Sequence, residues 1–290
     1  MTVRQTLRTN SSARLARQSS PRRRTTNHWR RWAVSTPLMG TTFSLHVIRG
    51  PEDGRLRFET VAEACWKDLR DIERRFSPLA ENSDIRRLAR GELSLARADR
   101  RLREVEGLCR QAKEQTDGRF DAWYDGWFNP AGVIRGWAVD WVTERRLVPL
   151  LKELGASAIG LNAGGDMRLL TAPTSSWRWH IGITDPGAAR DTDRRLVATL
   201  DVKDGAIATS GAAEHDHHPV DPKTGRSAAS VASATVLADR LTDADLWATT
   251  AAVAGFDDLS WVQQAGVRAG LLVAPDGQVR QWANGVELAD

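Results

Sequence analysis

The order in which helical and strand patterns follow one another is the feature of this 290-residue chain that most constrains its fold. Trp32–Ile48 predicts strand, turn and strand, because Pro37 and Gly40 interrupt a run of β-prone residues. Arg55–Phe76 then carries apolar residues at helical spacing. Ala158–Leu170 predicts a hairpin around a Gly-Gly turn. Helices and strands mix without a regular βαβ rhythm, so the sequence predicts an α+β fold.

The remaining predicted elements follow from the same periodicities. Helices are expected over Asp84–Ala89 after a Ser83 cap, Asp99–Thr116, Gly136–Leu151 with Pro149 as terminator or kink, and Leu241–Ala254 after a Thr242/Asp243 cap. Strands are expected over Trp179–Ile183, Leu196–Val202, Ala206–Ala208 and Ser230–Leu237, and the chain finishes as a small helix and a hairpin over Trp261–Gly266, Leu271–Ala274 and Val279–Trp282. Cys65 and Cys109 fall in helical segments, where buried reduced thiols are expected and a single disulfide is the alternative.

Charge divides the chain into two parts. Residues 1–31 hold nine arginines and no Asp, Glu or Lys. Because the whole chain carries +4 and this segment +9, residues 32–290 carry −5. A nucleic-acid-binding protein would need a basic folded body, so no nucleic-acid partner is expected.

The arginine-rich segment is rich in Ser and Thr and has the composition of a disordered tail. A nucleic-acid or anionic-membrane tether, an organelle-type presequence and a mis-called start codon are the alternatives that its composition leaves open. It has no apolar run of a signal peptide and no lipobox, and the chain has no window of about 18 apolar residues. A cytoplasmic protein without a transmembrane segment is therefore expected.

The stretch Thr209–Gly225, TSGAAEHDHHPVDPKTG, concentrates chemistry after a predicted strand. It holds three of the six histidines of the chain and closes on Asp221–Gly225, which has the composition of a tight turn. A rigid turn beside an imidazole is a suitable mount for a general base. A polar surface loop is the alternative. A zinc site at His215, His217 and His218 is a weaker interpretation, because the sequence has no second Cys or His cluster at ligand spacing. Ser210 as a hydrolase nucleophile is also weaker, because TSG is not the G-x-S-x-G nucleophile elbow.

Asp245 and Thr249 are four residues apart on a predicted helix and so share a face. A carboxylate and a hydroxyl are hard oxygen ligands that suit Mg²⁺ rather than zinc. An ordinary first-turn aspartate and a core-facing threonine are the alternative reading. Glycines that let backbone amides approach phosphates lie in separate turns, and each is a weak signal alone: Gly132, Gly136, Gly164, Gly165 and Gly211.

Nine short motifs occur in the order found in the ApbE-type flavin transferases, the FAD:protein FMN transferase family, which residues 35–255 resemble. They are Met39-Gly40-Thr41, Phe76-Ser77 with Ser83 and the following Arg87-Leu88, Asp117–Asp121, Asn129–Asp140, Asn162–Asp166, Trp179–Pro186, Thr209–Gly211, His218–Gly225 and Asp245–Thr249. The resemblance implies one compact T-fold-like catalytic domain over residues 32–290, with antiparallel sheets and flanking helices, after the disordered basic tail of residues 1–31.

The resemblance also implies an activity. The family uses FAD as substrate, cleaves its pyrophosphate, attaches FMN through a phosphoester to a Thr or Ser hydroxyl of a partner flavoprotein, and releases AMP. It implies Mg²⁺ held by Asp245, Thr249 and the backbone carbonyl of Gly132, and His218 as general base, with neighbouring His217 leaving that assignment open. Residues implied to line the FAD site are Met39, Arg119, Phe120, Asp121 and Arg135.

Three positions depart from the family pattern. Arg135 stands where lysine is usual, Asn129 replaces an aspartate, and Leu79 replaces an aromatic residue often found near the flavin. None of these removes the Asp245/Thr249 pair, so an active transferase is expected. An FAD-binding or storage protein and a Mg²⁺-dependent FAD pyrophosphatase on the same fold are the alternatives.

Overall fold

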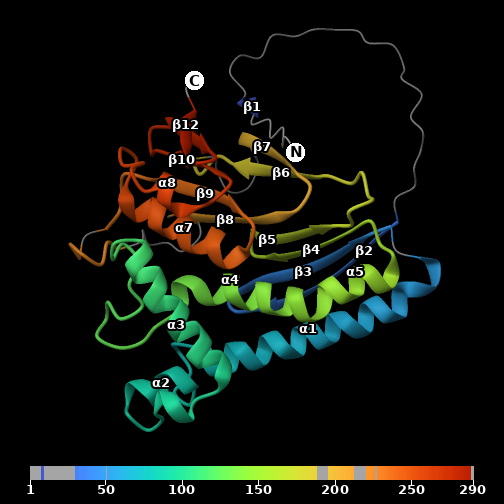
Figure 1. Ribbon diagram of the computed structural model, residues 1–290, viewed down its shortest axis with the longest axis horizontal. Coiled ribbons are helices and arrows are strands. Elements are labelled where there is room, and N and C mark those ends of the chain that lie inside the picture. The colour runs from blue at the N-terminus through green and yellow to red at the C-terminus, as the bar shows by residue number, and fades with distance from the viewer. Residues whose placement is uncertain are drawn as a thin grey trace.

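The fold is built around a large antiparallel sheet. The computed structural model describes residues 8–9, 30–49, 51–187, 195–211, 220–225 and 227–288. Helices cover one face of this nine-stranded sheet, and a three-stranded sheet covers part of the other face (Figure 1). Every pairing among the described strands is antiparallel, and the α+β prediction is confirmed.

The nine strands of the large sheet lie in the order β12-β11-β10-β9-β8-β5-β4-β3-β2. Their bounds are β2 (Arg31–Leu38), β3 (Thr41–Ile48), β4 (Ala158–Ala163), β5 (Asp166–Thr171), β8 (Gly205–Gly211), β9 (Ser233–Ala238), β10 (Ala269–Val273), β11 (Val279–Ala283) and β12 (Val286–Leu288). The hairpins predicted over Trp32–Ile48 and Ala158–Leu170 are confirmed as β2–β3 and β4–β5.

The small sheet consists of β1 (Arg8–Thr9), β7 (Leu196–Val202) and β6 (Trp179–Thr184). Leu200 of β7 packs with Leu169, Leu237 and Leu271 of the large sheet, so the small sheet covers the β5–β8–β9–β10 half of that face. Within the expected disordered tail, Arg8–Thr9 pairs with β7 and Arg31 opens β2, while the other residues up to 29 lie outside the described part of the chain.

The helices of the described chain are α1 (Arg55–Phe76), α2 (Asp84–Ala89), α3 (Arg100–Gln115), α4 (Ala131–Val142), α5 (Val148–Leu154), α7 (Leu241–Ala254) and α8 (Val262–Ala265). The predicted bounds of α1, α2 and α7 are confirmed, and the Ser83 side chain caps α2 by accepting from Arg86 N at 3.2 Å. None of these helices has both the length and the apolar character needed to cross a membrane.

The predicted start of the fourth helix at Gly136 is wrong. α4 begins at Ala131, where Asn129 Oδ1 accepts a hydrogen bond from the Ala131 amide at 3.2 Å. Pro149 does not end the segment either. A π-helical turn, Thr143–Leu147, joins α4 to α5, and Pro149 lies in the first turn of α5, where a missing N–H is tolerated.

Two further expectations need correction. Thr209–Gly211 continues β8 rather than opening a loop, because its backbone pairs with β9 through Gly211. Thr242 and Asp243 do not cap α7, whose N-cap position is Arg240.

The two cysteines are reduced, as predicted. Cys65 and Cys109 are free and buried, and burial raises the pKa of each thiol to about 12.

Candidate active site

α4 and α7 approach closely at Gly136. A Cβ atom built on Gly136 would lie 2.7 Å from the Leu241 carbonyl oxygen and 3.0 Å from Asp245 Cβ, so glycine is required at this crossing. The Gly136 amide donates a hydrogen bond to Asp245 Oδ2 at 3.2 Å. The crossing therefore places the Asp245 carboxylate beside the first turns of α4, which contain Gly132.

Asp245 and Thr249 on α7 are each half-buried. Their neighbours Leu246, Trp247 and Ala248 are all buried. The prediction that the two oxygen-bearing side chains share one helix is confirmed, since α7 spans both. Among the described residues, no three His, Cys, Asp or Glu side chains converge as a metal cluster. A magnesium site here would therefore need hydroxyl or backbone oxygens beside the carboxylate.

Phe120 packs against the start of α4. Its side chain is buried, and a Cβ atom built on Gly132 would lie 3.0 Å from Phe120 Cε2. The Phe120 amide donates to Thr116 Oγ1 at 3.0 Å, which ties this segment to the end of α3. The structure thus brings Phe120 and Gly132 into contact.

Arg135 lies one turn further along α4 and faces the end of the large sheet. Its Nη1 is 3.6 Å from Asp166 Oδ2, and the Asp166 side chain is buried. Asp166 Oδ1 accepts from the Thr209 amide at 3.1 Å, and Thr209 Oγ1 is 2.9 Å from Thr235 Oγ1. Asp166 and Thr209 thus lie beside Arg135, although the motifs that contain them did not predict them as candidate site residues.

Met39 lies in the β2–β3 turn with a left-handed φ of 48°. Its amide donates to Glu73 Oε1 at 2.8 Å. The neighbouring β4–β5 turn is close by, since the Gly164 amide donates to the Thr42 carbonyl at 3.1 Å. The β2–β3 turn that carries Met39 therefore lies beside the β4–β5 turn, which ends at Asp166.

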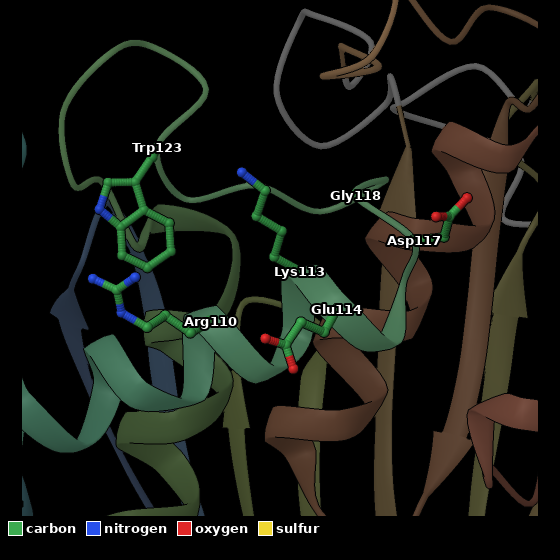
Figure 2. A pocket seen from close by; sticks show the side chains of 6 residues that line it. All are labelled: Arg110, Lys113, Glu114, Asp117, Gly118 and Trp123. Carbon is green, nitrogen blue, oxygen red and sulfur yellow. The ribbon is translucent and has the colours of Figure 1, made fainter.

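Arg119 and Asp121 are held by ion pairs on either side of Phe120. Arg119 Nη2 is 2.5 Å from Asp258 Oδ2, and Asp121 Oδ2 is 2.7 Å from Lys113 Nζ. Figure 2 shows a hollow beside this segment, with the Trp123 ring next to the Arg110 guanidinium. The hollow has a volume of about 690 Å³ and is lined by Arg110, Lys113, Glu114, Asp117, Gly118 and Trp123. Two of its lining residues, Asp117 and Gly118, directly precede Arg119 in the chain.

The three histidines of the Thr209–Gly225 stretch, His215, His217 and His218, lie outside the described residues. The turn that follows them is described and agrees with its prediction: the Gly225 amide donates to the Asp221 carbonyl at 2.8 Å, and Gly225 has φ of 68°. Lys223 Nζ lies 2.5 Å from Asp117 Oδ2. The turn is thereby anchored beside the segment that carries Arg119, Phe120 and Asp121.

Comparison with known proteins decides the family. The model of the ApbE family matches residues 39–129 and 125–271, which is most of the chain. This chain belongs to the ApbE family. It is 33% identical over 169 residues to the FAD:protein FMN transferase of Treponema pallidum, covering 54% of this chain and 45% of that protein. It is 33% identical over 129 residues to the FAD:protein FMN transferase of Rhodobacter capsulatus, covering 41% of this chain and 24% of that protein. These alignments span less than half the length of either relative.

Solved structures of ApbE proteins share the fold of this family member. The ApbE protein of Thermotoga maritima superposes with a TM-score of 0.73 at 23% identity, covering 86% of this chain and 96% of that one. Flavin transferase ApbE from Vibrio cholerae gives a TM-score of 0.66 at 20% identity, covering 88% and 97%. The Pseudomonas stutzeri flavinyl transferase ApbE gives 0.67 at 20% identity, covering 88% and 94%. The expected ApbE-like architecture is thus confirmed.

In this ApbE-family chain, the predicted site residues form two groups. The α4–α7 crossing and its surroundings bring together Gly132, Phe120, Arg135, Asp245 and Thr249. Arg119, Asp121 and Met39 form the second group, and they contact Asp258, Lys113 and Glu73 respectively. Their roles toward a ligand stay predictions.

Proposed function

We propose that this protein is a Mg²⁺-dependent transferase that moves FMN from FAD to a Thr or Ser hydroxyl of a partner flavoprotein. A phosphoester bond forms between the hydroxyl oxygen and the FMN phosphorus, and the pyrophosphate bond breaks to release AMP. The observation that carries the proposal is the α4–α7 crossing, where the Gly136 amide contacts Asp245 beside Gly132 and Arg135 in a chain of the ApbE family. The curated relatives named FAD:protein FMN transferase support the same activity.

The oxygen donors at the crossing fit Mg²⁺. By helix geometry the Gly132 carbonyl oxygen lies about 3 Å from the Gly136 amide nitrogen. Asp245 Oδ2 lies 3.2 Å from the same nitrogen, so both oxygens are neighbours of one group. Thr249 adds a hydroxyl on the next turn of α7, which completes a set of hard oxygen ligands. When bound, Mg²⁺ would neutralise charge on the pyrophosphate oxygens as AMP leaves.

Arg135 and Phe120 are the residues that we assign to flavin and phosphate binding nearest the crossing. Arg135 has a permanent positive charge and five donors in a planar fork, which suits phosphate oxygens. Asp166 holds its side chain at the sheet end, 3.6 Å away. Phe120 presents an apolar wall beside Gly132. Met39, Arg119 and Asp121 complete the proposed FAD site around this centre.

His218 is the proposed general base. A neutral imidazole at this position would take the proton from the acceptor hydroxyl as that oxygen attacks phosphorus. Two described features support this place in the chain. The Thr209 amide near the end of β8 donates to Asp166, and the turn that begins at Asp221 is anchored to Asp117 through Lys223. The described chain thus stops two residues after Thr209 and resumes at a turn tied to Asp117, two residues before Arg119.

The deciding experiment incubates the purified chain with FAD, Mg²⁺ and a flavoprotein domain that has a Thr or Ser flavinylation site. Transfer predicts a fluorescent acceptor band on a denaturing gel and one AMP released for each FMN attached. Bound FAD without a fluorescent band would instead indicate storage. AMP and free FMN released without an acceptor would indicate a pyrophosphatase, because water would then replace the hydroxyl.

The base assignment predicts that His218→Ala stops flavin transfer and leaves FAD binding unchanged, because the imidazole moves a proton and does not hold the flavin. Activity is read from the fluorescent band, and FAD affinity from the change in flavin fluorescence. The matched control is His217→Ala, which should retain transfer. The reverse pattern would assign the base to His217.

A further inference from the structure

Asp140 is a buried carboxylate that the proposed reaction does not use. It lies near the end of α4, and its side chain is 1% exposed. Its oxygens accept hydrogen bonds from the Leu241 amide at 3.0 Å, the Thr242 amide at 2.8 Å and Thr242 Oγ1 at 2.6 Å. These amides belong to the first turn of α7, whose N–H groups have no partner within their own helix. Asp140 therefore caps α7 from a different helix.

The capping arrangement of α7 is unusual because its own N-cap position, Arg240, makes no side-chain cap hydrogen bond. A cap supplied by the residue just before a helix stabilises only the start of that helix. A cap supplied from α4 also fixes where α7 starts relative to α4. Asp140 is thus a link between two elements as well as a helix cap.

Two arginines complete the surroundings of Asp140. Arg168 Nε of β5 lies 3.3 Å from Oδ1, and Arg240 Nε lies 3.6 Å from Oδ2. Arg168 also donates to the carbonyl of Gly205, the first residue of β8, at 3.0 Å. A buried carboxylate is costly unless charges and hydrogen bonds compensate it, and here both are supplied. The Asp140 cluster therefore joins α4, α7, β5 and β8.

The same four elements carry the proposed active site. α4 holds Gly132 and Arg135, α7 holds Asp245 and Thr249, β5 begins at Asp166, and β8 ends with Thr209–Gly211. Asp245 lies one helical turn after the capped residues Leu241 and Thr242, so a shift at the start of α7 is passed directly to the Asp245 carboxylate.

We propose that Asp140 is a positioning residue for the Mg²⁺ site. By capping α7 from α4, it sets the place of Asp245 and Thr249 relative to the Gly132 carbonyl. This inference rests on the proposed function for the identity of the metal, whereas the positioning of α7 by Asp140 can be measured separately.

The first test is calorimetric titration of Mg²⁺ into the full chain with FAD present. Asp140→Asn keeps the shape of the side chain but removes its charge and one acceptor oxygen, and we expect Mg²⁺ binding to weaken about 10–100-fold, as for other residues that orient metal ligands. Thr242→Val removes the hydroxyl hydrogen bond alone and should give a smaller loss. This second variant also serves if Asp140→Asn does not fold.

The matched control is Val105→Ala, which opens a cavity at a buried position of α3 and destabilises the protein, while the hydrogen bonds and ion pairs of Asp140 described above do not involve Val105. Its Mg²⁺ affinity should equal that of the wild type. Wild-type affinity in both Asp140→Asn and Thr242→Val would overturn the proposal. An equal loss in Val105→Ala would also overturn it, because general destabilisation would then explain the effect.

The second test does not depend on the metal. Amide hydrogen exchange over residues 241–249 should become faster in Asp140→Asn and stay unchanged in Val105→Ala. If the wild type binds no Mg²⁺ while exchange at α7 responds as expected, the metal assignment fails and the positioning of α7 stands. Unchanged exchange at α7 in Asp140→Asn would overturn the positioning role itself.

Discussion

Asp140 and Asp245 are two carboxylates at the α4–α7 contact with different surroundings. Asp140 is almost fully buried, and its oxygens accept from α7 and face two arginines. Asp245 is half-buried, and its Oδ2 accepts a hydrogen bond from the Gly136 amide at 3.2 Å. A buried carboxylate whose charge is neutralised by hydrogen-bond donors and arginines of the protein has a structural role. The less buried one, with a hydroxyl on the next turn, is the better candidate for binding a cation.

The metal assignment predicts that Asp245→Asn lowers the turnover rate by at least about 100-fold at saturating FAD, because the carboxylate charge that holds Mg²⁺ is lost. Thr249→Val should weaken the apparent Mg²⁺ affinity by about tenfold. Initial rates of acceptor flavinylation across a Mg²⁺ series measure both effects.

Thr250→Val is the matched control for Thr249. The Thr250 hydroxyl is buried and donates to the Leu246 carbonyl within α7, so its loss should leave the Mg²⁺ dependence unchanged. Wild-type turnover in Asp245→Asn would contradict the metal assignment.

His46 supplies a prediction about pH. Burial, together with the positive charge of Arg31, lowers the pKa of His46 from 6.5 to about 4. Between these values the unfolded chain binds a proton that the folded chain does not, so stability is complete above pH 6.5 and falls as the pH drops toward 4. Allowing for the partial exposure of the ring, the loss is on the order of 1 kcal/mol.

His46→Asn removes this titration. Urea unfolding at pH 7.5 and at pH 4.5 should therefore show a smaller decrease in free energy of unfolding for the variant than for the wild type. His180→Asn, at an exposed position of β6, is the control. An identical decrease in His46→Asn and wild type would show that His46 does not contribute to the acid sensitivity.

Gly136 sets the distance between two helices. A Cβ atom at this position would meet the Leu241 carbonyl at 2.7 Å, and backbone cannot move aside cheaply. Gly136→Ala should therefore lower the free energy of unfolding by about 1–3 kcal/mol. It should also weaken Mg²⁺ binding, because α7 carries Asp245. Thermal unfolding and the Mg²⁺ series measure the two effects.

Gly107→Ala is the matched helical control. Gly107 is an exposed residue of α3 with open space around its Cβ position. Alanine should stabilise α3 there by about 0.5–1 kcal/mol. A stabilising or neutral effect of Gly136→Ala would mean that the helices are not in close contact at this point.

The sequence predicted those elements whose periodicity and capping residues lie within the element itself. α1 was predictable because its apolar residues follow one face, and α2 because Ser83 caps it within its own sequence. The start of α4 was not, because Gly132 and Gly136 resemble helix breakers. In the structure, the backbone of α7 requires glycine at position 136, and Gly132 faces the Phe120 ring at close range. The fold around them could not be read from propensity alone.

The cap of α7 shows the same limit more strongly. Thr242 and Asp243 match a local capping pattern, yet the cap is Asp140, which lies about a hundred residues earlier in the chain. The Asp245/Thr249 pair was predictable from spacing of four residues, while the contact of Asp245 with Gly136 was not. Spacing predicts which residues share a helix face, and only packing decides what that face meets.

At the scale of the whole molecule, one sheet supports two hydrophobic cores. Leu161 of β4 is buried under the helices, and Leu271 of β10 is buried under the small sheet. β5 and β8 pair directly, although β6 and β7 come between them in sequence and form the small sheet. Because the large sheet is continuous, we expect residues 32–290 to unfold as one domain.

Leu161→Ala and Leu271→Ala test this expectation from the two faces. Each replacement leaves a cavity beside the same sheet and should lower the free energy of unfolding by about 2–5 kcal/mol. Both variants should unfold in a single calorimetric transition at a lower melting temperature than the wild type. The reason is that the two cores are built on the same strands, so weakening either core weakens the whole sheet. Two separate transitions, with Leu271→Ala shifting only one of them, would show that the small sheet and its core unfold independently of the α4–α7 site.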